Sequence, residues 1–444
     1  MIQAFRYILV VVMTLFAFAA TNAQSVKTHK VKKGETIYGI AHSNGITEAQ
    51  LRAANPGMES PSYMLKKGDK IIIPLQQAVP QQQEQPMGAD DVRNRTIRMG
   101  VMLPLHDVNG DGRRMVEYYR GLLMACDSLK REGISVDIYA WNTPDDADIA
   151  PTLAKAEAVH PDIIFGPLYS KQMDQLSEFC RKQGTMMVIP FSINAPQIAS
   201  NSHIFQVYQA PDGQNETTAR RFSEWFTGYN PIIVDCDDPN STKGAFTSAL
   251  RQQLNAHNMR FSLTSLKSAN NLFASAFSTQ RPNIVVLNSA RADDLKVLFV
   301  KLKDLTAANA DVKVSVFGYT EWLPLVESQQ TNFHKYDVYL PTPAYPGMSP
   351  LLSKELTAKY RSNFKRDMIA FTPPLALTGF DHALFFLRGL HKYGASFDGA
   401  AGRFGYQPVQ TPLKFEHLPN GGYQNRGFMF VHFKPTGQIE TISY

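Results

Sequence analysis

The stretch 106–118, HDVNGDGRRMVEY, carries oxygen-bearing side chains at alternating positions, namely Asp107, Asn109 and Asp111. This spacing, followed by a glycine, is how an EF-hand calcium loop begins, because its first ligands come from every second residue. Such a loop also needs a bidentate carboxylate at its twelfth position. Counted from Asp107 that position is Tyr118, and Glu117 lies one place early. The stretch therefore lacks a ligand that calcium requires.

No enzymatic motif accompanies this loop. The sequence contains no H-E-x-x-H, G-x-S-x-G, G-x-x-x-x-G-K-[ST] or C-x-x-C, and its eleven histidines are scattered without the spacing of a metal site. Its three cysteines are Cys126, Cys180 and Cys236. Two lie in apolar-periodic segments, so we expect buried thiols rather than a disulfide framework; one disulfide in an oxidising compartment is the alternative. We expect no catalytic residue, no metal and no cofactor.

The length of 444 residues predicts two or three domains, and 44% hydrophobic against 19% charged residues predicts folded ones. Residues 1–23 have the pattern of a signal peptide, with Arg6 before the apolar run Ile8–Ala20 and Ala23 at the cleavage position. That run is shorter than the roughly 20 apolar residues of a membrane span. We expect an exported protein, periplasmic or associated with the cell wall, that keeps no membrane span after cleavage; a retained anchor helix is the alternative.

Residues 27–76 form a small unit with the expected order strand, helix, helix, strand. The residues 29–32 and 70–73 alternate like strands, 37–42 fits a short helix, and Thr47 with Gln50 forms a capping box for a second helix. The unit contains eight basic and four acidic residues, a net charge of +4. Few aromatic residues interleave with these lysines, so we expect no nucleic acid as a partner.

The segments VKKGETIYGIA, ITEAQLRAANP and LKKGDKIIIP resemble a LysM domain, a βααβ module that binds N-acetylglucosamine in peptidoglycan or chitin. The resemblance implies a glycan-binding groove between two loops, made of Gly34, Glu35, Thr36, Ile37, Pro56, Gly57 and Met58. Loops of this kind supply backbone hydrogen-bonding groups and a small apolar wall for an acetamido sugar. Helix capping alone is the alternative role for these residues. A single copy lacks avidity, so weak affinity is expected.

Residues 77–95 are rich in Gln and Pro and nearly free of large apolar residues, which predicts a flexible linker. In 96–444 the pattern changes to strands alternating with helical stretches such as 116–133 and 170–184. Strands are predicted at 97–105, 136–142, 162–169, 186–192 and 204–208, and again at 230–238, 260–266, 282–288, 314–319 and 337–341. Two rounds of five strands predict an α/β fold with two doubly wound lobes, each built on a mostly parallel sheet.

The late segment 353–444 adds helical stretches and short strands at 412–418 and 427–433, enough to cross back between the lobes. The order of segments IRMGVMLPL, YYRGLLMACDSL, IIFGPLYS, MVIPFS, IFQVYQAPDGQ and TGFDHALFFLRGL resembles the type I periplasmic binding proteins, especially the branched-chain amino-acid receptors. The resemblance implies a solute-binding cleft between the lobes.

Ligand-binding loops of doubly wound folds follow the carboxyl ends of the strands. By this rule the loop 106–113 is a cleft rim, with a plain solvated turn as the alternative. The candidate cleft residues are His106, Asp107, Tyr169, Ser170, Ser192, Asn194, Tyr319, Thr320 and Tyr345, with Asp381 on the segment that crosses between the lobes. For each hydroxyl, helix capping is the alternative role.

Two non-enzymatic functions follow from these patterns. In the first, the LysM-like module tethers a solute-binding or sensing domain to peptidoglycan, and the lobes close on a small polar molecule such as an amino acid or a wall fragment. In the second, the two-lobed domain is a protein-interaction scaffold that regulates wall synthesis and whose cleft is degenerate. The segment GPLYSKQMDQLSEF resembles the related domain of outer-membrane activators of penicillin-binding proteins, which supports wall-synthesis proteins as partners.

Overall fold

The computed structural model describes residues 27–32, 66–73, 91–191, 194–209, 211–400 and 405–444, and single positions between 37 and 58. The chain divides into two compact units, Met1–Gly88 and Ala89–Tyr444. This division falls inside the segment 77–95 that the sequence assigns to a linker. The described residues of the second unit begin at Asp91, which caps a short helix η2 (Val92–Asn94), so residues 91–95 of the predicted linker belong to that unit.

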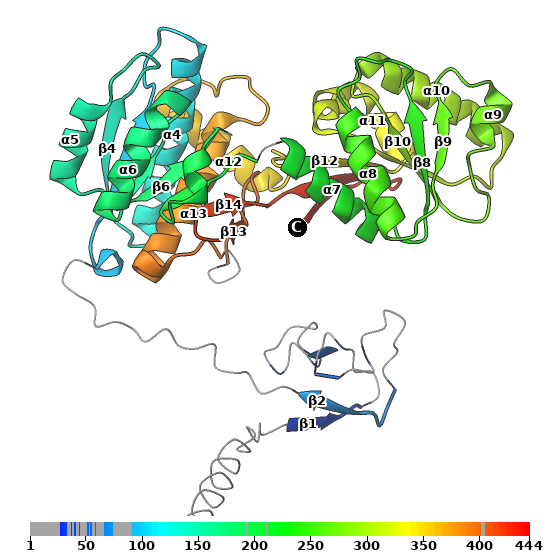
Figure 1. Cartoon of the computed structure of the whole chain (residues 1–444), viewed down its shortest axis with the longest axis horizontal. Helices are drawn as coiled ribbons and strands as arrows, with labels where there is room; N and C mark the ends of the chain where they lie inside the picture. Colours follow the sequence, from blue (N-terminus) through cyan, green and yellow to red (C-terminus); the bar gives the residue numbers. More distant parts are fainter. Residues whose placement is uncertain are drawn as a thin grey trace, which may run out of the picture. The chain divides into compact units, whose positions relative to one another are not determined.

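The first unit has the two strands that the sequence predicts. Strands β1 (Lys27–Lys30) and β2 (Lys70–Ile73) pair antiparallel, with Lys27 opposite Ile73 (Figure 1). The described positions 37, 40, 51 and 52 are helical. A small core holds the unit together, and its buried side chains are Val31, Ile40, Leu51, Met58, Ile71 and Ile73. The described part of the unit therefore agrees with a βααβ arrangement.

The second unit consists of two lobes, each with a seven-stranded sheet between helices (Figure 1). The sheet of lobe 1 has the order β13-β14-β7-β6-β5-β3-β4. Its strands are β3 (Ile97–Leu103), β4 (Val136–Asn142), β5 (Ile163–Phe165), β6 (Met186–Ile189), β7 (Ile204–Gln206), β13 (Phe415–His417) and β14 (Tyr423–Asn425). Its helices are α4 (Gly110–Arg131), α5 (Ala150–Val159), η3 (Ser170–Gln172), α6 (Met173–Gln183), η4 (Pro196–Ala199), α12 (Pro350–Phe364), α13 (Leu375–Tyr393) and η6 (Gly394–Ser396).

The sheet of lobe 2 has the order β16-β15-β12-β11-β10-β8-β9. Its strands are β8 (Asn230–Asp235), β9 (Ser262–Ser265), β10 (Asn283–Leu287), β11 (Val314–Phe317), β12 (Val338–Thr342), β15 (Met429–Phe433) and β16 (Ile439–Ser443). Its helices are α7 (Pro211–Trp225), α8 (Gly244–Ala256), α9 (Asn270–Ala274), α10 (Ala292–Ala308), η5 (Thr320–Leu325) and α11 (Val326–Lys335).

The central strands of both sheets are parallel and buried along their length, as in β5 and β10. Buried parallel strands read as unbroken apolar runs because helices cover both faces of the sheet. All ten predicted strands of the two rounds are confirmed by β3–β12. The late strands predicted at 412–418 and 427–433 correspond to β13 and β15. Strand β13 belongs to the sheet of lobe 1 and β15 to the sheet of lobe 2.

Three connecting segments join the lobes, and hydrogen bonds fix each of them in place. The first follows β7, the second follows β12 and the third lies between β14 and β15. The Gln209 side chain in the first donates to the Gly427 carbonyl in the third, at 2.9 Å. The second is fixed to lobe 1 because the Tyr345 N–H donates to the Gln410 carbonyl at 2.9 Å.

Helices α4 and α13 pack at very short range in lobe 1. A Cβ atom at Gly121 of α4 would overlap the Ala376 carbonyl of α13, and one at Gly379 of α13 would overlap the Tyr118 carbonyl of α4. The two glycines therefore let the backbones approach. This packing buries most of α13, which the sequence assigned in part to a segment crossing between the lobes.

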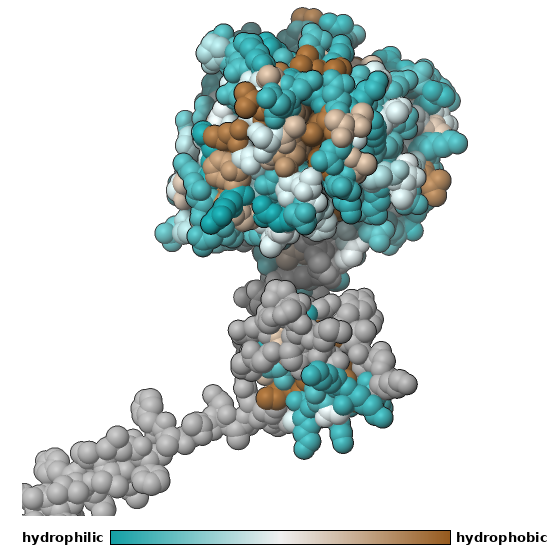
Figure 2. All heavy atoms as spheres, turned by 90° about the vertical axis from the view of Figure 1, so that its right-hand side faces the viewer, coloured by the Kyte–Doolittle hydropathy of each residue, from teal (hydrophilic) through white to brown (hydrophobic). Residues whose placement is uncertain are grey.

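Lobe 2 exposes apolar side chains at its β9 edge. They come from β9, α9 and α10 and are Leu263, Leu272, Val297 and Val300, each 45–62% exposed. Figure 2 shows apolar side chains at the surface of the second unit. Exposed apolar clusters on folded domains commonly mark interaction surfaces. Within the described residues, no helix combines the length and the apolar character that crossing a bilayer requires.

Candidate functional site

The loop that follows β3 is a helix cap. Helix α4 begins at Gly110, inside the calcium-like spacing, and the Asn109 side chain accepts a hydrogen bond from the Gly112 N–H at 2.9 Å. The Asp111 carboxylate lies in the first helical turn and pairs with Arg114. Asp107 is 91% exposed at its side chain and lies 3.8 Å from Arg113. Capping and the favourable placement of an acid at a helix N-terminus account for this spacing.

The carboxyl edge of the lobe 1 sheet carries an accessible group of candidate residues. The Tyr169 hydroxyl lies 3.4 Å from the Asp111 carboxylate, and burial together with that neighbouring charge raises the pKa of Tyr169. Ser170 and Asn194 are exposed, and His106 is half-buried. Ser192 lies outside the described residues. We call the set His106, Asp107, Tyr169, Ser170 and Asn194 the lobe 1 rim.

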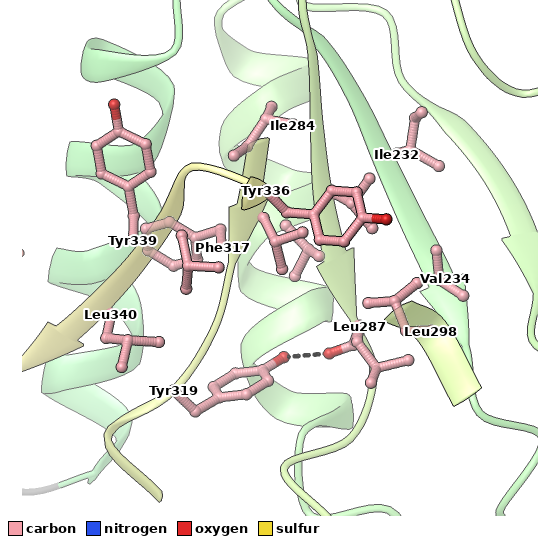
Figure 3. Close-up of a cluster of buried hydrophobic side chains, with 14 of the residues drawn as sticks. Ile232, Val234, Ile284, Leu287, Leu298, Phe317, Tyr319, Tyr336, Tyr339 and Leu340 are labelled. Atoms are coloured by element: carbon pink, nitrogen blue, oxygen red, sulfur yellow. Dashed lines mark hydrogen bonds between the residues drawn. The ribbon is translucent and has the colours of Figure 1, made fainter. Parts of the chain in front are cut away.

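Two candidate residues of lobe 2 use their hydroxyls within the lobe; Tyr319 is buried and Thr320 is exposed. The Tyr319 ring is 5% exposed and its hydroxyl donates to the Leu287 carbonyl at 2.7 Å (Figure 3). The neighbouring Thr320 hydroxyl donates to the Pro341 carbonyl at 2.8 Å. Burial raises the pKa of Tyr319 well above its ordinary value. Both hydroxyls thus satisfy backbone carbonyls of their own lobe.

Acidic groups that follow β8 in lobe 2 are also engaged. The Asp237 carboxylate accepts a hydrogen bond from the Ser265 hydroxyl, and the Asp238 carboxylate lies 2.9 Å from the Arg291 guanidinium. A receptor for amino acids needs an acid for the ammonium group of its ligand. To serve in this way, Asp237 or Asp238 would first have to leave its present partner.

Asp381 lies in the interior of lobe 1. It belongs to α13, is 0% exposed, and accepts backbone hydrogen bonds from Val409, Gln410 and Thr411 at 2.7–2.9 Å. This clamp holds the segment whose Gln410 carbonyl binds Tyr345 of the second connecting segment. The placement differs from the crossing segment expected from the sequence, because close packing of α13 on α4 draws the residue into the core.

Of the candidate glycan-binding residues, the structure describes two. Met58 is 2% exposed and belongs to the core, and Ile37 packs against that core. Gly34, Glu35, Thr36, Pro56 and Gly57 lie outside the described residues. We therefore keep these five, together with the partly buried Ile37, as candidates for contact with a sugar and assign Met58 to the core.

Sequence reasoning missed the role of Asn55. Its side-chain amide donates to the Leu51 and Ile72 carbonyls, and its oxygen accepts the Ile72 N–H, all at 2.7–2.8 Å. The residue ties the segment after the second helical stretch to strand β2. The Asn-Pro pair at 55–56 was the available signal, but it is also the signal of an ordinary turn.

A second missed feature lies beneath the lobe 1 rim. The Tyr118 hydroxyl and His382 Nδ1 are 3.0 Å apart in the core, and the Phe191 ring packs edge-on against Tyr118 at 5.0 Å. Burial lowers the pKa of His382 to about 3, so the imidazole is neutral. The pair links α4 to α13 directly below the end of β6.

Comparison with known proteins identifies the first unit. Residues 29–74 match the LysM domain family. Over 67 residues the chain is 40% identical to the N-acetylmuramoyl-L-alanine amidase sle1 of Staphylococcus epidermidis, and the same relative is found in a second strain of that organism. The matched region covers 14% of this chain and 20% of the amidase, so the chain spans about a fifth of the curated relatives it matches.

The second unit is similar to solved structures of low sequence identity. A branched-chain amino acid ABC transporter protein from Rhodospirillum rubrum aligns with a TM-score of 0.54 and 16% identity, over 78% of this chain and 100% of that one. Full-length LpoA from Haemophilus influenzae aligns with a TM-score of 0.50 and 12% identity, over 80% of this chain and 60% of that one. Similarity at this level establishes the fold alone. The chain therefore carries a LysM domain at residues 29–74, followed by a domain with the fold of the type I periplasmic binding proteins.

Proposed function

We propose that this chain is an exported, non-enzymatic peptidoglycan-binding protein, whose LysM domain holds the two-lobed domain at the cell wall. The observation that carries the proposal is the LysM match at residues 29–74. The described part of that domain has a closed core and the Asn55 clamp, so the unit has what it needs to fold. Both domains are of kinds that bind rather than catalyse.

The glycan is the expected ligand of the LysM domain. We propose that Gly34, Glu35, Thr36, Ile37, Pro56 and Gly57 line its groove, with N-acetylglucosamine as the recognised sugar. The basic side chains of residues 27–76 add attraction to an anionic wall polymer. Calorimetric titration of the full chain with an N-acetylglucosamine tetramer measures this binding. We expect a weak, saturable interaction that the chain without residues 27–76 lacks; binding of equal strength in both would contradict the assignment.

For the two-lobed domain, we favour a protein-interaction scaffold that regulates wall synthesis. The specific support is that Tyr319, Thr320 and Asp381 all bind backbone groups of their own lobe. If these side chains turned toward a ligand, the backbone groups that they now satisfy would lose their hydrogen-bond partners, which is unfavourable. The apolar side chains exposed on lobe 2 and the resemblance of the segment 166–179 to activators of penicillin-binding proteins support the same function.

A solute receptor is the second candidate, and the lobe 1 rim favours it. His106, Asp107, Tyr169, Ser170 and Asn194 retain accessible polar groups at the carboxyl edge of the sheet, where ligands of this fold bind. Here the ligand would be a small polar molecule such as an amino acid or a wall fragment.

Small-angle scattering and thermal unfolding separate the two functions. A receptor closes on its ligand, so amino acids or soluble wall fragments should reduce the radius of gyration and raise the Tm. For a scaffold we expect no such change that depends on the lobe 1 rim. A ligand-induced rise in Tm that Ser170→Ala abolishes would contradict the scaffold and establish the receptor.

A further inference from the structure

A polar cavity lies beside the segments that connect the lobes. Its volume is about 200 Å³, and it is lined by Gly213, Glu216, Thr217, Arg220, Gln253, Glu416 and Arg426. None of these residues belongs to the candidate cleft. Five come from helices α7 and α8 of lobe 2, one from strand β13 of lobe 1, and Arg426 from the third connecting segment.

The cavity is built where the lobes are joined. The third connecting segment is fixed beside the first, because Gln209 donates to the Gly427 carbonyl at 2.9 Å and Asn425 donates to the Val207 carbonyl at 3.2 Å. Helix α7 follows the first connecting segment directly, and Gly213 in its first turn lies against the Arg426 guanidinium. Movement of one lobe against the other would therefore change the distance between the walls of the cavity.

The walls carry balanced charge, with two guanidinium groups and two carboxylates. Arg426 Nε lies 3.5 Å from Glu416 Oε2, and the Arg426 side chain is only 28% exposed. On α7, Glu216 and Arg220 lie one turn apart, and in the described part of the chain neither forms an ion pair within 4.0 Å. The Thr217 hydroxyl and the Gln253 amide add hydrogen-bonding groups between them.

We infer that this cavity binds a small zwitterion, an amino acid or a dipeptide, through its carboxylate on Arg220 and Arg426 and its ammonium group on the glutamates. Guanidinium groups bind carboxylates with paired hydrogen bonds. Both signs of charge line the walls, so a ligand that carries both charges finds a partner for each, whereas a ligand of a single charge engages only half of them. Since α7 belongs to lobe 2 and Glu416 to lobe 1, the bound ligand contacts both lobes and stabilises one arrangement of them.

The test is calorimetric titration of the full chain with D-alanyl-D-alanine and with its L,L isomer. We expect saturable binding of at least one isomer. Arg220→Gln and Arg426→Gln should each weaken it about tenfold or more, since each removes a charged partner of the carboxylate. The matched control is Arg251→Gln, an exposed arginine on α8 whose side chain contacts Ser248 and not the cavity; its affinity should equal that of the unchanged protein.

Four results would overturn the inference. One is the absence of saturable binding by either isomer, and another is binding that Arg220→Gln leaves unchanged. The third is binding that Ser170→Ala abolishes, which would place the dipeptide at the lobe 1 rim instead. Acetate and ethylammonium serve as probes of one charge each, and binding of either as tight as that of the dipeptide would refute a zwitterion site. Arg220 is exposed, so Arg220→Gln should fold normally. It therefore tests the site even if substitution of the less exposed Arg426 disturbs folding.

Discussion

At the scale of single residues, polar side chains that the sequence suggests for ligand binding serve the fold in several places. Asn109 caps a helix, Tyr319 binds a carbonyl in its own lobe, and Asp381 clamps three backbone amides. A hydroxyl or carboxylate after a strand has the same appearance in sequence whether it faces solvent or the core. Its direction depends on tertiary neighbours that are distant along the chain.

Asp381 gives a prediction for the pH dependence of stability. Burial raises its pKa to about 7, although the three amide donors act in the opposite direction. The unfolded chain has a pKa of about 3.9 at this group, so the folded protein holds the proton more tightly. The free energy of unfolding should therefore fall as the pH rises from about 4 to about 7, by up to about 4 kcal/mol, and stay constant above that.

Denaturant unfolding of the full chain and of Asp381→Asn at several pH values measures this contribution. The variant has no titrating group at this position. The free energy of unfolding of the unchanged protein minus that of the variant should therefore fall as the pH rises from about 4 to about 7. Its overall stability should also be lower, because one amide oxygen cannot accept all three N–H donors. If the free energies of unfolding of the two proteins changed in parallel from pH 4 to pH 8, this would show that Asp381 stays ionised in the folded protein.

The loop at 107–112 gives a second prediction. Asn109→Ala removes the cap of α4 and should lower the free energy of unfolding by about 1 kcal/mol. Addition of calcium chloride should leave the Tm of the unchanged protein as it is, and Asp107→Ala, a change at an exposed carboxylate, should also be neutral. A Tm that rises with calcium and loses this rise in Asp107→Ala would restore the metal site.

At the scale of elements, the packing of α4 on α13 depends on two glycines. Gly379→Ala places a Cβ atom against the Tyr118 carbonyl, so the helices must separate, at a cost of about 3 kcal/mol in the free energy of unfolding. Gly244→Ala at the start of α8 is the control, because a Cβ atom there meets nothing within 4 Å and should change stability by less than about 1 kcal/mol. Equal effects of the two substitutions in thermal or denaturant unfolding would disprove the close contact.

The elements were largely predictable from sequence, because buried parallel strands appear as apolar runs such as 163–165 and 284–287. The start of α4 was not, since Gly110 and Gly112 are poor helix formers and the first turn reads as a loop. Strand β14 has the sequence YQN and carries no alternation that would reveal it. Its pairing with β7 and β13 comes from the return of the chain to lobe 1.

At the scale of the whole molecule, two folded units of different kinds lie on one chain. The first is a LysM domain of about fifty residues, and the second has the size and topology of a binding protein. Single LysM copies lack the avidity of repeats. In the proposed function, attachment to the wall would therefore concentrate the second domain at a surface without fixing it there permanently.

Co-sedimentation with purified peptidoglycan sacculi tests this account most directly. The full chain should sediment with the sacculi, and residues 91–444 alone should remain in the supernatant at the same protein concentration. Because the attraction is partly electrostatic, the sedimented fraction of the full chain should fall as the salt concentration rises. Equal sedimentation of both proteins, or none of the full chain at low salt, would contradict a wall-binding role for the LysM domain.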